Sequence, residues 1–125
     1  MDLQIKLFRW LSKGHHIIAL TRGPIDIAAV VQIFAEVAEI TQPLEDCKIL
    51  IDLRDSTYKL DPADIQAFTS ELQPSVWPEG SKIALLSAAS REQYDQLMVL
   101  SSCLSNRGFR VAVFYDANSS ASWLA

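Results

Sequence analysis

Apolar residues recur along this chain with two different periods, and the alternation predicts strands and helices in turn. Two extended segments come first, LQIKLFRWL at 3–11 and HHIIALTR at 15–22, and Ser12, Lys13 and Gly14 separate them. Apolar runs on both sides of a short, glycine-containing turn are typical of a β-hairpin. The sequence therefore predicts two antiparallel strands at the start of the chain.

The segment GPIDIAAVVQIFAEVAEIT at 23–41 has the period of a helix that packs on one face. Pro24 is acceptable in a first helical turn, and the charge of Asp26 suits the positive end of the helix dipole. Further helices are predicted at residues 61–73, 90–108 and 117–125, with Asp61 and Ser90 placed to cap the first two and Gly108 ending the second.

Three more strands are predicted between these helices, at residues 47–54, 82–88 and 109–116. The strand at 47–54 is apolar on both faces, as in a strand covered by helices on either side. The resulting order, β-β-α-β-α-β-α-β-α, requires right-handed crossovers and a mostly parallel sheet with an N-terminal antiparallel hairpin. The expected fold class is α/β, in a single domain spanning residues 1–125.

The composition and charge of the chain argue against nucleic acid as a partner and against a membrane span. Half of the 125 residues are hydrophobic and the formal charge is −4, which gives no broad attraction to nucleic acid. No segment approaches the roughly 20 apolar residues of a membrane span. The first residues lack the charge pattern of a signal peptide, and Cys47 and Cys103 suit thiols kept reduced. We therefore expect a cytoplasmic protein with no membrane span and no nucleic-acid partner.

Polar residues follow the predicted strands, where ligands of parallel sheets usually bind beside helix N-termini. This interaction or ligand rim consists of Arg22, Arg54, Asp55, Ser56, Thr57, Asp61, Ser87, Ser90 and Arg91, with Thr21, Gly23 and Asp116 nearby. The three arginines could hold a polar or anionic ligand. Alternatively, these residues are helix caps and loop residues of the kind that every α/β domain carries.

The sequence contains no familiar catalytic, cofactor or metal motif. His15 and His16 are the only histidines, and consecutive strand residues point to opposite faces, so together they cannot bind one metal ion. Neither a G-x-S-x-G turn nor a glycine-rich phosphate loop can be written. We expect no catalytic, cofactor-binding or metal-binding residue and no enzyme activity. Trp123 is expected in the core, whereas Trp77 could be buried or form a contact patch.

Four segments together resemble a known family: TRGPIDIAAV, ILIDLRDSTYKLDPADI, KIALLSAASREQY and FRVAVFYDANSSASWLA. Their pattern, above all the final one, resembles the SpoIIAA-like branch of the STAS superfamily, which includes anti-sigma factor antagonists. The resemblance covers nearly the whole chain. It implies a SpoIIAA-like (STAS-like) domain with a regulatory role in protein–protein interaction.

The phosphorylation switch of those antagonists is missing at the corresponding position. Their Asp-Ser-Ser-Gly-Leu type turn is replaced here by LDPADI, in which Pro62 and Ala63 stand where the serines would be and Asp64 replaces the glycine. Ser56 and Thr57 lie upstream, in what the pattern indicates is a loop. The resemblance therefore implies the fold without this switch.

Two functions remain open at this point. The first is a non-enzymatic cytoplasmic module that binds a protein partner or a second copy of itself as a homodimer, through residues 54–65 and 87–91. The alternative is a domain that binds an apolar small molecule or lipid in a cavity between sheet and helices, since the branch also resembles lipid-transfer CRAL-TRIO domains. Ile25, Ile33 and Ile40 lie off the main apolar face of helix 24–41 and suggest such a cavity beside it.

Overall fold

The computed structural model describes residues 2–9, 15–44, 46–73, 77–78 and 80–125, with the backbone alone for residues 7–9. The predicted hairpin turn at 12–14, Trp10 and Pro74 lie outside the described residues. In the described part, the strands are β1 (Asp2–Arg9), β2 (His15–Ile25), β3 (Cys47–Tyr58), β4 (Lys82–Leu86) and β5 (Arg110–Phe114), and the helices are α1 (Ile27–Thr41), α2 (Pro62–Glu71), α3 (Arg91–Asn106) and α4 (Ala117–Leu124).

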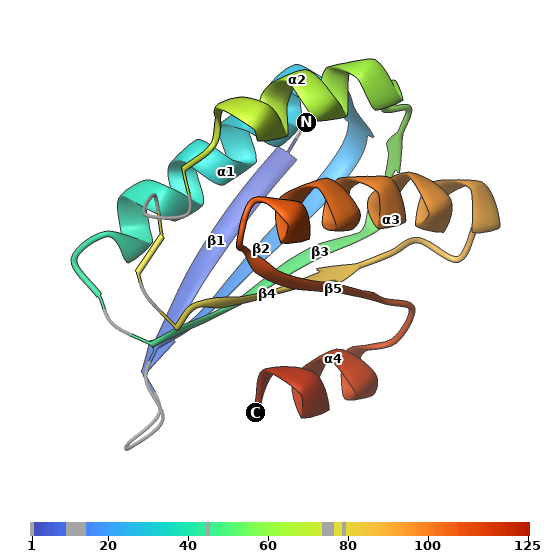
Figure 1. Cartoon of the computed structure of the whole chain (residues 1–125). Helices are drawn as coiled ribbons and strands as arrows, with labels where there is room; N and C mark the ends of the chain where they lie inside the picture. Colours follow the sequence, from blue (N-terminus) through green and yellow to red (C-terminus); the bar gives the residue numbers. More distant parts are fainter. Residues whose placement is uncertain (1, 10–14, 45, 74–76, 79) are drawn as a thin grey trace.

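The five strands form one mixed sheet in the order β1-β2-β3-β4-β5. β1 pairs antiparallel with β2, and every other neighbouring pair is parallel. The predicted α/β class, the opening antiparallel pair and the parallel remainder are therefore confirmed. Each crossover steps to the next strand in the same direction, so right-handed connections place α1, α2 and α3 on one face. α4 follows the last strand and covers part of the other face, as Figure 1 shows.

The hydrophobic core lies between the sheet and the three helices α1–α3. Alternate residues of β2 and β3, such as Ile17 and Ile49, are fully buried there against Val37 of α1. Trp77 is only 4% exposed and packs between Phe34, whose ring is tilted against it at 5.1 Å, and Phe109, which it meets edge to face at 5.4 Å between centroids. Trp77, for which the sequence allowed either burial or an exposed contact patch, is therefore a core residue.

Trp123 is less buried than Trp77, although the sequence favoured it for the core. It lies on the α4 side of the sheet, half-buried, with its ring 5.8 Å from that of Phe114. The reason is geometric: α4 is a helix of eight residues on the second face, where little else covers it.

The boundary between β2 and α1 differs from the prediction. β2 continues through Pro24 to Ile25, and α1 begins at Ile27 with Asp26 as its N-cap, whose side chain accepts a hydrogen bond of 2.9 Å from the Ala29 N–H. Pro24 lies beyond the last residue of β2 that β1 pairs, so its missing N–H removes no bond to β1. The proline thus belongs to a strand end and not to a first helical turn.

The space between α1 and the sheet is nearly filled in the described part of the chain. Ile25 and Ile33 are buried within this one chain, and only about 20 Å³ remains between α1 and the sheet. Ile33 is buried because the apolar face of α1 is wider than the predicted stripe. A space of this size has room for about one water molecule and none for a hydrocarbon chain. The motivation for a lipid cavity at this place is therefore lost.

No helix among the described residues combines the length and the apolar character needed to cross a bilayer.

The predicted caps of α2 and α3 are confirmed. Asp61 accepts from the Ala63 N–H at 2.8 Å, Ser90 accepts from the Gln93 N–H at 3.4 Å, and Gly108 ends α3 with a φ of 97°.

Candidate functional site

A β-bulge in β3 determines which polar side chains reach the surface. Leu20 of β2 lies opposite Asp52 of β3, but Arg22 lies opposite Asp55, so one residue of β2 faces two of β3. An extra residue in one strand shifts the alternation of side chains beyond it. Before the bulge the odd-numbered residues of β3 face the core, and after it Ser56 and Tyr58 do.

The sequence pattern predicted a loop around Ser56 and Thr57. This prediction is wrong, because the segment is the bulged end of β3. The extra residue lies at Leu53 and Arg54, which together face Thr21, and it shifts the alternation so that the consecutive residues Arg54 and Asp55 are both exposed. Thr57 is also exposed, whereas Ser56 is 3% exposed. Burial on the core side removes Ser56 from the contact surface that the sequence suggested.

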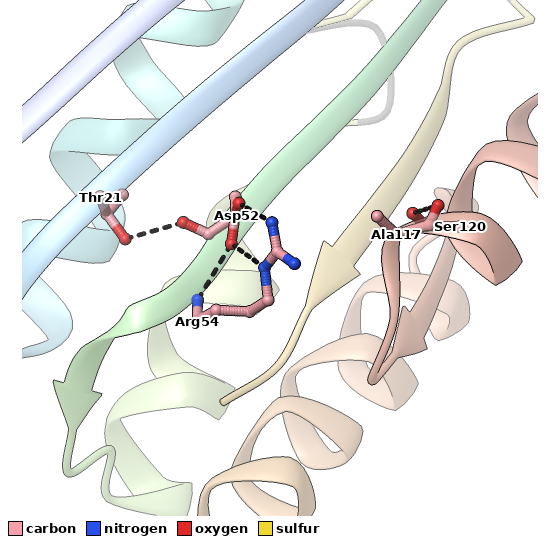
Figure 2. Close-up of polar contacts among 5 residues, drawn as sticks. All are labelled: Thr21, Asp52, Arg54, Ala117 and Ser120. Carbon is pink, nitrogen blue, oxygen red and sulfur yellow. Dashed lines mark hydrogen bonds and ion pairs between the residues drawn. The ribbon is translucent and has the colours of Figure 1, made fainter. Parts of the chain in front are cut away.

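Asp52 and Arg54 form an ion pair on the α4 face of β3. The Arg54 Nε donates to Asp52 Oδ1 at 3.0 Å, and its Nη2 donates to Asp52 Oδ2 at 2.8 Å (Figure 2). The backbone N–H of Arg54 also donates to Oδ1, at 3.1 Å. The Asp52 side chain is 9% exposed and that of Arg54 48%, so the guanidinium covers the carboxylate and remains accessible from outside.

The arginine keeps Asp52 ionised. Burial alone pushes the pKa of this carboxyl up, but the side-chain and backbone hydrogen bonds of Arg54 and its charge outweigh burial, so the pKa lies below its ordinary value. An ionised carboxylate accepts hydrogen bonds and cannot act as a general acid. The pair therefore holds a charged guanidinium in a fixed position at the protein surface.

Two further charges complete what we call the charged cluster, which consists of Arg22, Asp52, Arg54 and Asp55. Arg22 lies opposite Asp55 in the register of β2 and β3, and both are exposed. The hydrogen bonds that Arg54 donates to Asp52 raise the pKa of Arg54, burial works against this rise, and the charges of Asp52 and Asp55 add to it. The cluster thus presents alternating charges at the end of the sheet.

The hydroxyl groups near the cluster are engaged inside the fold. Thr21 Oγ1 donates to the backbone oxygen of Asp52 at 3.1 Å and lies 2.6 Å from Ser56 Oγ, so Ser56 is the donor in the second bond. Ser87 Oγ donates to the backbone oxygen of Ala88 at 2.8 Å. A serine hydroxyl has only one proton to donate, so the Tyr58 hydroxyl is the donor in its 3.2 Å hydrogen bond to Ser87 Oγ. Burial, opposed by the bond to Ser87, raises the pKa of Tyr58.

The predicted rim therefore separates into four groups of residues. Arg22, Arg54, Asp55 and Thr57 are exposed at the carboxyl ends of β2 and β3, whereas Ser56 and Ser87 are buried. Asp61 and Ser90 cap helices, as the plainer interpretation had it. Arg91 is exposed and pairs with Asp95 at 3.1 Å, one helical turn along α3.

Hollows flank the end of the sheet on its helix side. One groove of about 580 Å³ lies beside the N-terminus of α1 and is bordered by Asp26, Thr57 and Lys59. Another, of about 510 Å³, lies between α2 and α3 and is bordered by Asp61, Asp95 and Gln96. The first groove has one acidic and one basic residue on its border, whereas acidic residues predominate around the second, and neither is lined by Ser56 or Ser87.

The sheet carries a row of basic residues that was not predicted from the sequence. His16, Lys48, Lys82 and Arg110 lie directly opposite one another on four successive strands, on the α4 face. Each of them comes immediately before the first isoleucine or valine of its strand, as in HI, KI, KI and RV. Aligning the strand starts would have revealed this row, which we call the basic row.

Within the described residues, no group of three or more histidine, cysteine, aspartate or glutamate side chains could hold a metal ion. Cys47 lies in the core, where burial, followed by the charge of Asp46, raises the pKa of its thiol. A raised pKa keeps a thiol protonated and weakly nucleophilic. The surface at the end of β2 and β3 is thus suited to recognition by charge.

No protein-family model matches this chain, and no curated protein shows significant sequence similarity to it.

Proposed function

We propose that this protein is a non-enzymatic, regulatory interaction module that binds a protein partner through the charged cluster. The observation that supports this most is the bulge in β3, which turns Arg54 and Asp55 outward together beside Arg22. Bulges often re-aim side chains at functional sites. An exposed arginine held in place by a bidentate carboxylate, as Arg54 is by Asp52, suits recognition of an acidic or polar surface.

The pattern of hydroxyls supports binding over catalysis. Nucleophilic catalysis requires a hydroxyl or thiol that is exposed and held against a base. In the described part of the chain, Thr21, Ser56 and Ser87 are buried, Thr21 and Ser56 are hydrogen-bonded to each other, Ser87 donates to the oxygen of Ala88, and Cys47 has a raised pKa. The exposed groups at the ends of β2 and β3 are the charged side chains of Arg22, Arg54 and Asp55 and the hydroxyl of Thr57.

The SpoIIAA-like (STAS-like) assignment and a cytoplasmic location belong to the same proposal. Their support is the sequence pattern, and the order of strands and helices is compatible with it. The partner in this proposal is another polypeptide, and a second copy of the chain is the form that would make the protein a homodimer.

The test reverses charges outside the ion pair. Reversal at Arg54 would place two carboxylates in contact and would destabilise the fold, so Asp55→Lys and Arg22→Glu are the informative variants. Glu39→Lys, at an exposed position of α1, is the matched control. Each tagged variant is expressed in the native cells, checked by thermal melting, and its bound proteins are quantified by mass spectrometry.

We expect both cluster variants to lose the same bound polypeptide, while Glu39→Lys retains it. A partner that remains equally bound to folded Asp55→Lys and Arg22→Glu would contradict the proposed surface. Size-exclusion chromatography with light scattering distinguishes self-association from a different partner.

A further inference from the structure

The α4 face of the sheet is only partly covered. α4 lies over β4 and β5 and reaches β3, and its eight residues span about 12 Å. Ala84 and Leu86 of β4 are fully buried beneath it, whereas Ile18 and Leu20 of β2 and Leu50 of β3 remain partly exposed. A strip of apolar sheet surface therefore lies beside α4, as Figure 1 shows for the strands concerned.

This strip is the floor of a groove of about 580 Å³, which we call the α4 groove. Ile18 and Leu50 line the floor, and Ala117, Ala121 and Leu124 line the wall formed by α4. The small alanines leave the space that a larger side chain would fill. The wall itself is ordered by contacts within α4, including the bond of 2.8 Å from Ser120 Oγ to the oxygen of Ala117 (Figure 2). Binding sites for small molecules commonly have about 300–1,000 Å³ and mostly apolar walls.

The basic row crosses one end of the α4 groove. His16 and Lys48 line it directly, and Lys82 and Arg110 continue the row under α4, with strands about 4.8 Å apart. Lys82 donates to the oxygen of Trp123 at 3.1 Å and lies 5.5 Å from the Trp123 ring, so it is engaged with the end of α4. Lys48 forms no ion pair with any carboxylate among the described residues.

The cations in this row repel one another. Burial lowers the pKa of Lys82, and the charges of Lys48 and Arg110 lower it further. An anion beside Lys48 would relieve this repulsion and would gain a charge-assisted hydrogen bond. The α4 groove thus combines an apolar channel with a positive end.

We propose that the α4 groove binds a single-chain amphiphile with an anionic head group, of the fatty-acid class. The hydrocarbon chain lies along Ile18 and Leu50 against the alanines of α4, and the carboxylate lies at Lys48. This site is on a different surface from the charged cluster, and the inference does not rest on the proposed protein interaction.

A lipid bilayer fits this surface less well than a single amphiphile. The net charge of −4 gives no broad attraction to an anionic membrane. The most exposed large apolar side chains among the described residues are Val31, Met98, Val99 and Tyr115, and none of them lines the groove. A walled groove with one positive end selects a single chain with one charge.

The test is a fluorescence titration of the purified full chain with a naturally fluorescent polyene fatty acid, followed by displacement with palmitate. Hexadecanol, which has the same chain and no charge, is the head-group control. Lys48→Glu removes the positive end, and Ala121→Phe fills the groove. Lys59→Glu and Ala67→Phe, at exposed positions elsewhere, are the matched controls.

We expect saturable one-to-one binding below the micelle concentration. Lys48→Glu should weaken palmitate binding at least tenfold and leave hexadecanol nearly unchanged, and Ala121→Phe should weaken both. Each methylene removed from the ligand should weaken binding by about fourfold. The milder Lys48→Gln gives the same comparison if Lys48→Glu does not fold.

Three results would overturn the inference. The first is no displaceable binding of the free fatty acid. The second is palmitate binding by Lys48→Gln and Ala121→Phe that is as tight as that of the wild type. The third is binding only to vesicles that contain phosphatidylglycerol. The last result would identify a membrane surface in place of a ligand groove. None of these results bears on the charged cluster, so the two proposals fail independently.

Discussion

Replacing Arg54 by methionine should destabilise the protein mainly because it leaves the buried carboxylate of Asp52 without its cationic partner. The variant removes two hydrogen bonds, of 3.0 and 2.8 Å, from a carboxylate whose side chain is 9% exposed. The aliphatic part of the arginine is retained in methionine. The loss is therefore one of charge and hydrogen bonding and only to a small extent one of packing.

The size of the effect follows from burial. Removing one partner of a fully buried ion pair costs about 3–5 kcal/mol. Arg54 is 48% exposed, so water screens the pair, and the backbone N–H of Arg54 still donates to Asp52 in the variant. We expect a loss of about 2 kcal/mol in the free energy of unfolding, or roughly 8 °C in melting temperature for a domain of this size.

The assay is urea denaturation of the wild type, Arg54→Met, Asp52→Asn and the double variant. Asp52→Asn alone should cost about 1 kcal/mol, because an amide oxygen can still accept one bond. The double variant should lose about 2 kcal/mol, which is less than the sum, because no charge is then left without its partner. Additive losses, or a loss below about 0.5 kcal/mol for Arg54→Met, would refute the reasoning.

The same pair has a defined pH dependence. The pKa of Asp52 is lowered in the folded state, so its contribution to stability is complete above the unfolded pKa and is lost as the pH falls through the folded pKa. The stability difference between the wild type and Asp52→Asn should be constant near neutral pH and should shrink below about pH 4. A difference that grows with falling pH would contradict the assignment of the shift to Arg54.

Three other substitutions test local features of the fold. Gly23 has a φ of 87° and no atom within 4 Å of an added Cβ, so Gly23→Ala should cost about 1–2 kcal/mol from backbone strain alone, with a smaller loss for Gly23→Asn in the same thermal melts. Asp61→Ala should lower the free energy of unfolding by about 0.5–2 kcal/mol through loss of the α2 cap, whereas Gln66→Ala, at an exposed position of the same helix, should have little effect. Tyr58→Phe should cost about 0.5–1.5 kcal/mol, since Ser87 then loses a donor, and urea denaturation showing no loss would contradict the proposed direction of that hydrogen bond.

Local sequence signals predicted most of the helices and the order of elements. The α2 cap is an example, because Asp61 and Pro62 act within one turn and need no distant partner. The class of fold followed from the alternation of strand and helix patterns, which is also local. The family assignment stays a prediction.

The candidate site depended on register, which is not a local property. The bulge exists because β3 pairs with β2 in a particular alignment, and only that alignment turns Arg54 and Asp55 outward and buries Ser56. Pro24 was misplaced for a related reason, since its tolerance in β2 depends on where β1 ends. The basic row likewise appears only when the starts of four strands are compared.

The most direct test of the central claim is photo-crosslinking from the charged end of the sheet in the native cells. A photoreactive amino acid replaces Thr57, which is exposed beside the cluster, and in a control protein it replaces Ala67 on α2. We predict a discrete adduct with one polypeptide from position 57 and none from position 67. No adduct from position 57, or the same adducts from both positions, would contradict the assignment of the charged cluster as the contact surface.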